Sequence, residues 1–149
     1  MKRILFLIAA LGMCVSHAQA AGGFSCQADD KQVDDKQTDD RNVTRLVVEG
    51  ATPRAERGLI NFGAMLEVDN RKIVFKLADV KKFSGRNGII HVRATAQTGD
   101  DIFTISMNAR RNPKDENDWA GTYEVIQGVA GYKAMAANAK RGKVKCAVD

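Results

Sequence analysis

Histidine and cysteine, on which many catalytic and metal sites depend, are scarce in this sequence. The 149 residues include two histidines and three cysteines. The Cys-x-x-Cys, His-Glu-x-x-His, Gly-x-Ser-x-Gly and glycine-rich phosphate-binding motifs do not occur. Motifs therefore predict no catalytic residue, no metal site and no cofactor, although the composition leaves a Ser/His/Asp arrangement open.

Long apolar runs are also scarce, and the single long run lies within residues 1–20. Two basic residues precede an apolar run over residues 4–15, and Ala18-Gln19-Ala20 follows it. This pattern is typical of a secretory signal peptide cleaved after Ala20, and the run is too short for a membrane span. The alternative is an N-terminal anchor or a buried helix. We therefore expect a periplasmic or secreted protein with no transmembrane segment after cleavage.

Two cysteines, Cys26 and Cys146, remain after this cleavage. Export would place them in an oxidising compartment, and only one pairing is possible. We expect a disulfide that joins the first structural element to the last one. The alternative is a pair of free thiols or of metal ligands, but neither cysteine has a nearby Cys or His to complete a zinc site.

The most conspicuous repeat is a series of Asp-Asp pairs in residues 29–41. The pairs recur every five residues, and each is followed by a basic residue and an amide. This period matches neither a strand nor a helix, and the spacing is not that of a calcium-binding loop. We interpret residues 21–41 as an acidic N-terminal segment whose repeat is a solvated spacer. A cation-binding or docking role is the alternative.

Residues 42–149 carry the pattern of a β domain. Apolar and polar residues alternate with a period of two, and turn signals recur about every ten residues. We predict an all-β fold: a single small antiparallel barrel of about seven or eight strands, closed by the disulfide. At most a short helix is expected, at residues 132–140. The alternation is clearest in residues 59–68, 72–80, 89–97 and 102–110, whereas residues 81–88 are predicted to form a loop.

The segment from residue 119 to residue 144 contains a pattern of glycines and aromatics. It comprises Gly121, Tyr123, Gly128, Gly131, Tyr132 and Gly142. In this pattern the segment resembles the C-terminal part of small β-barrels of the allene oxide cyclase-like and dirigent-like families. The resemblance implies a barrel with an apolar lumen able to hold a lipid-like or phenolic ligand. It implies no catalytic residue in this chain.

Candidate binding residues are few. His91 and Arg93 lie two residues apart on one face of a predicted strand, where they could bind an anionic group; the alternative is a solvated face. Residues 140–146 form a basic cluster, interpreted as an exposed edge strand protected by its charges, with cell-surface polyanions as alternative partners. The formal net charge of +5 does not by itself indicate nucleic acid, which we do not expect as a partner.

These observations favour a non-enzymatic, exported module that binds a small apolar or anionic ligand or a periplasmic protein. One alternative is a small barrel enzyme of the isomerase or cyclase type. Another is an inhibitor of a cell-wall hydrolase, for which residues 83–88 are a candidate exposed loop. The identity of the ligand or partner does not follow from the sequence.

Overall fold

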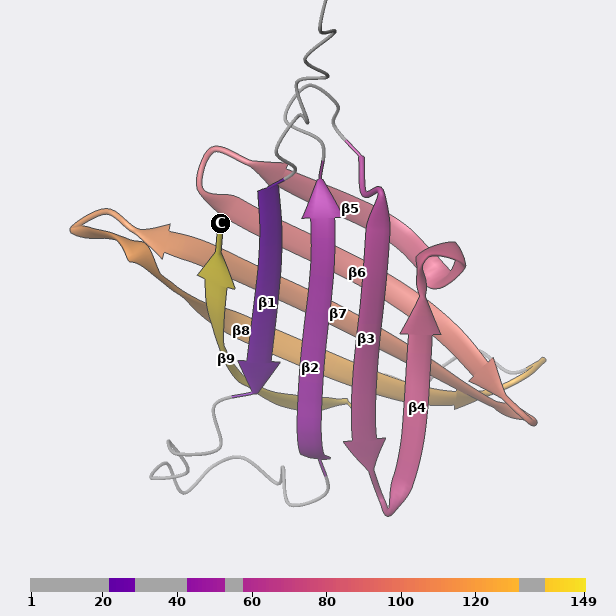
Figure 1. The fold of residues 1–149 in the computed structure, drawn as a ribbon. Helices are drawn as coiled ribbons and strands as arrows, with labels where there is room; N and C mark the ends of the chain where they lie inside the picture. The colour runs from indigo at the N-terminus through magenta and orange to yellow at the C-terminus, as the bar shows by residue number, and fades with distance from the viewer. Residues whose placement is uncertain (1–21, 29–42, 53–57, 132–138) are drawn as a thin grey trace, which may run out of the picture.

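Nine strands and one turn of 3₁₀ helix make up the part of the chain that the computed structural model describes (Figure 1). The described residues are 22–28, 43–52, 58–131 and 139–149. The predicted signal peptide, the Asp-Asp repeat and most of the predicted short helix lie outside them. The elements are β1 (Gly22–Ala28), β2 (Val43–Thr52), β3 (Asn61–Val68), β4 (Arg71–Lys76), η1 (Leu77–Asp79), β5 (Val80–Arg86), β6 (Ile89–Thr98), β7 (Asp101–Asn112), β8 (Asp115–Val129) and β9 (Lys140–Val148).

The strands form a single antiparallel sheet that curls into a nearly closed barrel. Their order is β4-β3-β2-β1-β9-β8-β7-β6-β5, so β1 lies between β2 and β9. Strands β1 to β4 form one layer, and β5 to β8 run diagonally across it (Figure 1). The two sheet edges, β4 and β5, are joined through η1. The predicted all-β antiparallel barrel is therefore confirmed, with nine strands instead of seven or eight.

The two additional strands are β1 and β5. Strand β1 lies within the segment that we assigned to the acidic N-terminus. Strand β5 occupies most of residues 81–88, for which the prediction of a loop was wrong. Phe83 pairs with Val92 of β6, but the ladder shifts register between Val80 and Lys82. This irregularity interrupts the alternation that would have marked a strand in the sequence.

The barrel interior is filled by the apolar side chains that alternate along the strands. The alternation predicted for residues 59–68 turns Phe62, Ala64 and Leu66 of β3 inward. Two apolar residues within the predicted alternating segments 59–68 and 72–80 are instead exposed, Ile60 by 54% and Leu77 by 42%. Ile60 precedes β3 and Leu77 begins η1, so neither belongs to a strand whose alternation would turn it inward. In the described ranges, no charged residue is buried and no helix is long and apolar enough to cross a membrane.

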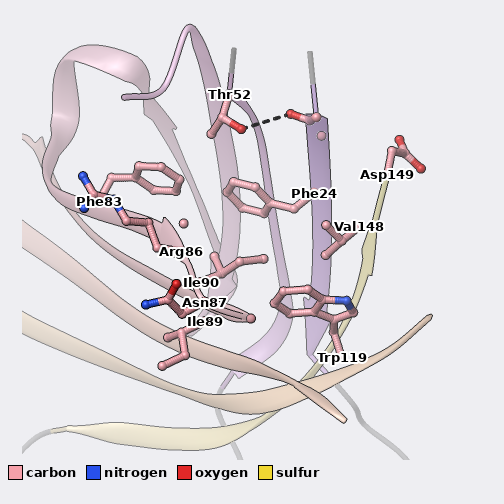
Figure 2. A pocket seen from close by; sticks show the side chains of 14 residues that line it. Phe24, Thr52, Phe83, Arg86, Asn87, Ile89, Ile90, Trp119, Val148 and Asp149 are labelled. Atoms are coloured by element: carbon pink, nitrogen blue, oxygen red, sulfur yellow. Dashed lines mark hydrogen bonds between the residues drawn. The ribbon is translucent and has the colours of Figure 1, made fainter. Parts of the chain in front are cut away.

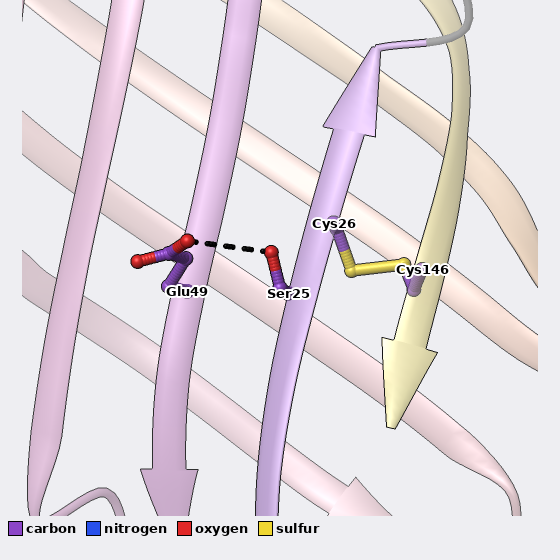
Figure 3. Close-up of a disulfide and its surroundings, with 4 residues drawn as sticks. All are labelled: Ser25, Cys26, Glu49 and Cys146. Atoms are coloured by element: carbon purple, nitrogen blue, oxygen red, sulfur yellow. Dashed lines mark hydrogen bonds between the residues drawn. A yellow bond between two sulfur atoms is a disulfide. The ribbon is translucent and has the colours of Figure 1, made fainter. Parts of the chain in front are cut away.

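The predicted disulfide joins the first and last described strands. Cys26 of β1 and Cys146 of β9 face each other in the ladder, with an S–S distance of 2.04 Å (Figure 3). The neighbouring Ser25 points to the opposite face, where its Oγ donates to Oε1 of Glu49 over 3.4 Å. Because β9 pairs with both β1 and β8, the interpretation of the basic cluster as an edge strand was wrong.

One end of the barrel is closed by charged and polar side chains. Arg71 of β4 donates to Asp101 at the start of β7 over 2.5 Å, and its guanidinium carbon lies 5.1 Å from the centre of the Phe103 ring. Lys140 donates to both carboxylate oxygens of Asp69, in the β3–β4 turn, over 2.9 Å. These contacts join β4 and its turn to β7 and β9, and thus tie the two layers together.

Candidate functional site

The opposite end of the barrel contains an open pocket with a volume of about 150 Å³ (Figure 2). Its walls come from the start of β1, the end of β2, the β5–β6 hairpin, one residue of β8 and the end of β9. Strands β2, β1, β9 and β8 are neighbours in the sheet, and the curl of the sheet brings the β5–β6 hairpin to them. The lining residues are Gly22, Gly23, Phe24, Thr52, Phe83, Gly85, Arg86, Asn87, Gly88, Ile89, Ile90, Trp119, Val148 and Asp149.

Three aromatic side chains from different strands define the pocket. The rings of Phe24 and Phe83 are stacked, with centroids 6.0 Å apart and planes 9° from parallel. The Trp119 ring lies below them in Figure 2, beside Val148. Its Nε1 donates to the backbone oxygen of Glu116 over 3.1 Å, which fixes the orientation of the indole. The aromatic walls therefore provide a largely preformed apolar surface.

Glycines allow two of these rings to lie close to the sheet. Phe24 faces Gly50 across the β1–β2 ladder, where a Cβ atom on Gly50 would lie 2.5 Å from the Phe24 ring. A Cβ atom on Gly85 would lie 2.9 Å from the ring of Phe83. An aromatic ring that covers a glycine in this way fills the space left by the missing side chain. The two glycines thus set where the stacked rings lie.

The rim of the pocket is polar. Arg86 and Asn87 extend from the β5–β6 hairpin on one side, and Asp149 lies on the other (Figure 2). The hairpin is tight because Asn87 and Gly88 both adopt positive φ, 54° and 71°, as a two-residue turn of this kind requires. On the other side, the backbone nitrogen of Asp149 donates to the oxygen of Gly23 over 2.9 Å. Both sides of the rim are therefore held by the backbone.

His91 and Arg93, the ligand candidates from the sequence, do not line this pocket. Both lie on the outer face of β6, and Nδ1 of His91 is 2.5 Å from Oδ1 of Asn108 on β7. The carboxylates Glu67 of β3 and Glu124 of β8 do not line the pocket either. The four residues do not converge on one cavity. Binding of an anion by His91 and Arg93 stays a prediction.

The described residues contain no group of three or more His, Cys, Asp or Glu side chains arranged to hold a metal ion. Neither a protein-family model, nor a curated protein, nor a solved structure matches this chain. The resemblance over residues 119–144 extends to barrel architecture, and no family is identified. The fold and the site define a small disulfide-bridged antiparallel β-barrel with an aromatic pocket at one end.

The pocket residues carried little signal in the sequence. Phe24 lies in a short glycine-containing segment, Phe83 in a predicted loop and Trp119 at the end of a polar turn. The one available signal was that Trp119 is the single tryptophan of the chain. A lone aromatic beside a turn does not by itself predict a pocket, because many such residues cover the end of a core.

Proposed function

We propose that this protein is an exported, non-enzymatic binding module that holds the apolar part of a small ligand in the end pocket. The observation that carries the proposal is the convergence of Phe24, Phe83 and Trp119 on one open cavity. Small-ligand sites are typically concave and apolar, with a few polar groups that fix orientation. The end pocket has this form, with Arg86 and Asp149 at its rim.

The size of the pocket points to a single ring or a short branched group. A cavity of about 150 Å³ is smaller than the sites of drug-sized ligands, and an engineered apolar cavity of that volume in another protein binds benzene. The rest of the ligand would lie at the rim. A carboxylate or phosphate on the same ligand would find the guanidinium of Arg86 there, which can bind such a group through two hydrogen bonds.

The structure favours this function over inhibition of a hydrolase. That alternative invoked residues 83–88 as a protruding loop, but Phe83 to Arg86 belong to strand β5 and only Asn87 and Gly88 form the turn. For the alternative of a small barrel enzyme, the described strands supply no acid and base that converge on the end pocket. Export remains part of the proposal, supported by the bridge between Cys26 and Cys146, since disulfides persist in oxidising compartments.

The test uses Trp119, which is both a wall of the pocket and the only tryptophan. Benzoate and benzyl alcohol serve as probes, with binding followed by Trp119 emission and by saturation-transfer NMR. We expect saturable binding of both. The variant Arg86→Gln should weaken benzoate binding by about tenfold and leave benzyl alcohol unaffected.

A pair of variants with the same side-chain change controls for folding. Val148→Phe fills the pocket and should abolish binding of both probes, whereas Val74→Phe adds the same ring to an exposed position on β4 and should bind normally. The absence of saturable binding to the wild-type protein, or equal binding by the Val148→Phe variant, would refute the proposal.

A further inference from the structure

Three rows of outward-facing side chains on β5 to β9 carry a charge that is mostly of one sign. Alternation turns fifteen side chains of these strands outward in three rows, each of which crosses β5, β6, β7, β8 and β9 in register. The rows are Lys82, Arg93, Ser106, Glu124 and Arg141; Ser84, His91, Asn108, Thr122 and Lys143; and Arg86, Ile89, Arg110, Ala120 and Lys145. Seven of the fifteen are Lys or Arg, and one is a carboxylate.

The single carboxylate does not offset these charges. Nε of Arg141 donates to Oε1 of Glu124 over 2.7 Å, so one cation of the rows neutralises it. Four of the five side chains of the second row, those before Lys143, are hydrogen-bonding groups without a permanent charge, and Nδ1 of His91 lies 2.5 Å from Oδ1 of Asn108. The outer face of the other layer differs, because Arg45, Lys72 and Lys76 alternate there with Glu49 and Glu67.

Protection of a sheet edge does not explain this face. Charged side chains on edge strands commonly prevent unwanted strand pairing, but β6, β7, β8 and β9 each have a neighbour on both sides. The rows extend over about 19 Å across five strands and lie about 7 Å apart along each strand. Such an array of cations, with Ser, Thr and Asn side chains between them in the first two rows, fits an extended ligand with regularly spaced negative charges.

We infer that the outer face of β5 to β9 binds an acidic polysaccharide. A chain of sugar acids combines repeated carboxylates, which match the Lys and Arg side chains, with hydroxyls that match Ser106, Asn108 and Thr122. Single-stranded nucleic acid fits less well, because its binding sites usually add aromatic platforms for the bases, and the three rows contain no Phe, Tyr or Trp. Only Arg86 and Ile89 of the third row also line the end pocket, and the variants of the test below leave both unchanged, so the inference is tested independently of the pocket.

The test measures binding of a fluorescently labelled oligogalacturonate by anisotropy over a series of salt concentrations. We expect the affinity of the wild-type protein to fall steeply with salt, as for ligands that release counterions. The triple variant Arg93→Gln, Arg110→Gln and Lys143→Gln should bind at least about tenfold more weakly and with a shallower salt dependence. Uncharged dextran should not bind.

A triple variant on the opposite layer, Arg45→Gln, Lys72→Gln and Lys76→Gln, removes the same charge and should bind like the wild-type protein. If both triple variants weakened binding equally, the binding would depend on net charge alone and the inference would be overturned. Equal or tighter binding of a DNA oligonucleotide or of polyglutamate, or no binding at low salt, would also overturn it. If the first triple variant does not fold, the single variants Arg93→Gln and Lys143→Gln replace it, and each should weaken binding of the oligogalacturonate.

Discussion

Replacing both Cys26 and Cys146 by alanine should remove a large part of the stability of the barrel. The bridged residues are separated by 120 positions in the sequence. In the chain-entropy model, opening a loop of this length costs about 5 kcal/mol, because the unfolded chain regains its conformational freedom. Domains of this size are typically stable by about 5 to 15 kcal/mol. The loss should therefore be comparable with the whole stability of a weakly stable domain.

The folded structure itself should change little. Strand β1 pairs with β2 and with β9 along its length, so the ladders hold it in place without the bridge. Cys26 and Cys146 are 0% and 9% exposed, so alanine at these positions also removes buried sulfur atoms. Reduction of the wild-type protein leaves the sulfur atoms in place. The difference between the reduced protein and the double variant should thus be a packing loss of about 1 to 2 kcal/mol.

Urea unfolding of the oxidised, reduced and doubly substituted proteins, followed by Trp119 fluorescence and far-ultraviolet circular dichroism, measures these differences. The m-value should rise when the bridge is lost, because the uncrosslinked unfolded chain exposes more surface. The control Val144→Ala, a buried position on β9, should lower stability without this rise. A loss on reduction below about 2 kcal/mol, or an unchanged m-value, would show that the bridge does not act by restricting the unfolded chain.

Two further predictions concern the sheet and the closed end of the barrel. Gly121→Ala should cost about 3 kcal/mol or more, because a Cβ atom would lie 2.6 Å from the Cα atom of Ala109, whereas Gly63→Ala, with open space around it, should be tolerated in the same urea titration. The hydrogen bond from Arg71 holds the pKa of Asp101 below its ordinary value of 3.8. The carboxylate of Asp101 is therefore protonated less readily in the folded protein than in the unfolded chain. Its stabilising effect is fully present at pH values above the unfolded pKa, and it is lost as the pH falls through the lower pKa of the folded state. The stability difference between wild type and Asp101→Asn should accordingly shrink on acidification, and a difference that stays constant with pH would contradict this assignment.

The parts of the fold that the sequence predicted depend on local alternation. The alternation over residues 59–68 places Phe62, Ala64 and Leu66 on one face, because a strand with one buried face turns every second residue inward. The pairing of Cys26 with Cys146 followed from there being only two cysteines after the predicted cleavage. Both inferences were confirmed, because neither required knowledge of which strands are neighbours.

The parts that the sequence did not predict depend on contacts between distant segments. The register shift near Lys82 interrupts the alternation of β5, so the sequence did not indicate this strand. The position of β9 inside the sheet follows only from its pairing with β1. The stacking of Phe24 on Phe83 brings together residues from β1 and β5. No local sequence pattern predicts such a contact, because it forms only when the two layers of the sheet pack over each other.

The disulfide and the end pocket share strands β1 and β9. Phe24 lies two residues before Cys26 on the same face of β1, and Trp119 pairs with Cys146 in the β8–β9 ladder. The bond therefore fixes the relative positions of two of the three aromatic walls. The third wall, Phe83, lies on β5, an edge strand that the disulfide does not hold. Any adjustment of the pocket to a ligand is thus expected on the β5 side, where Arg86 also lies.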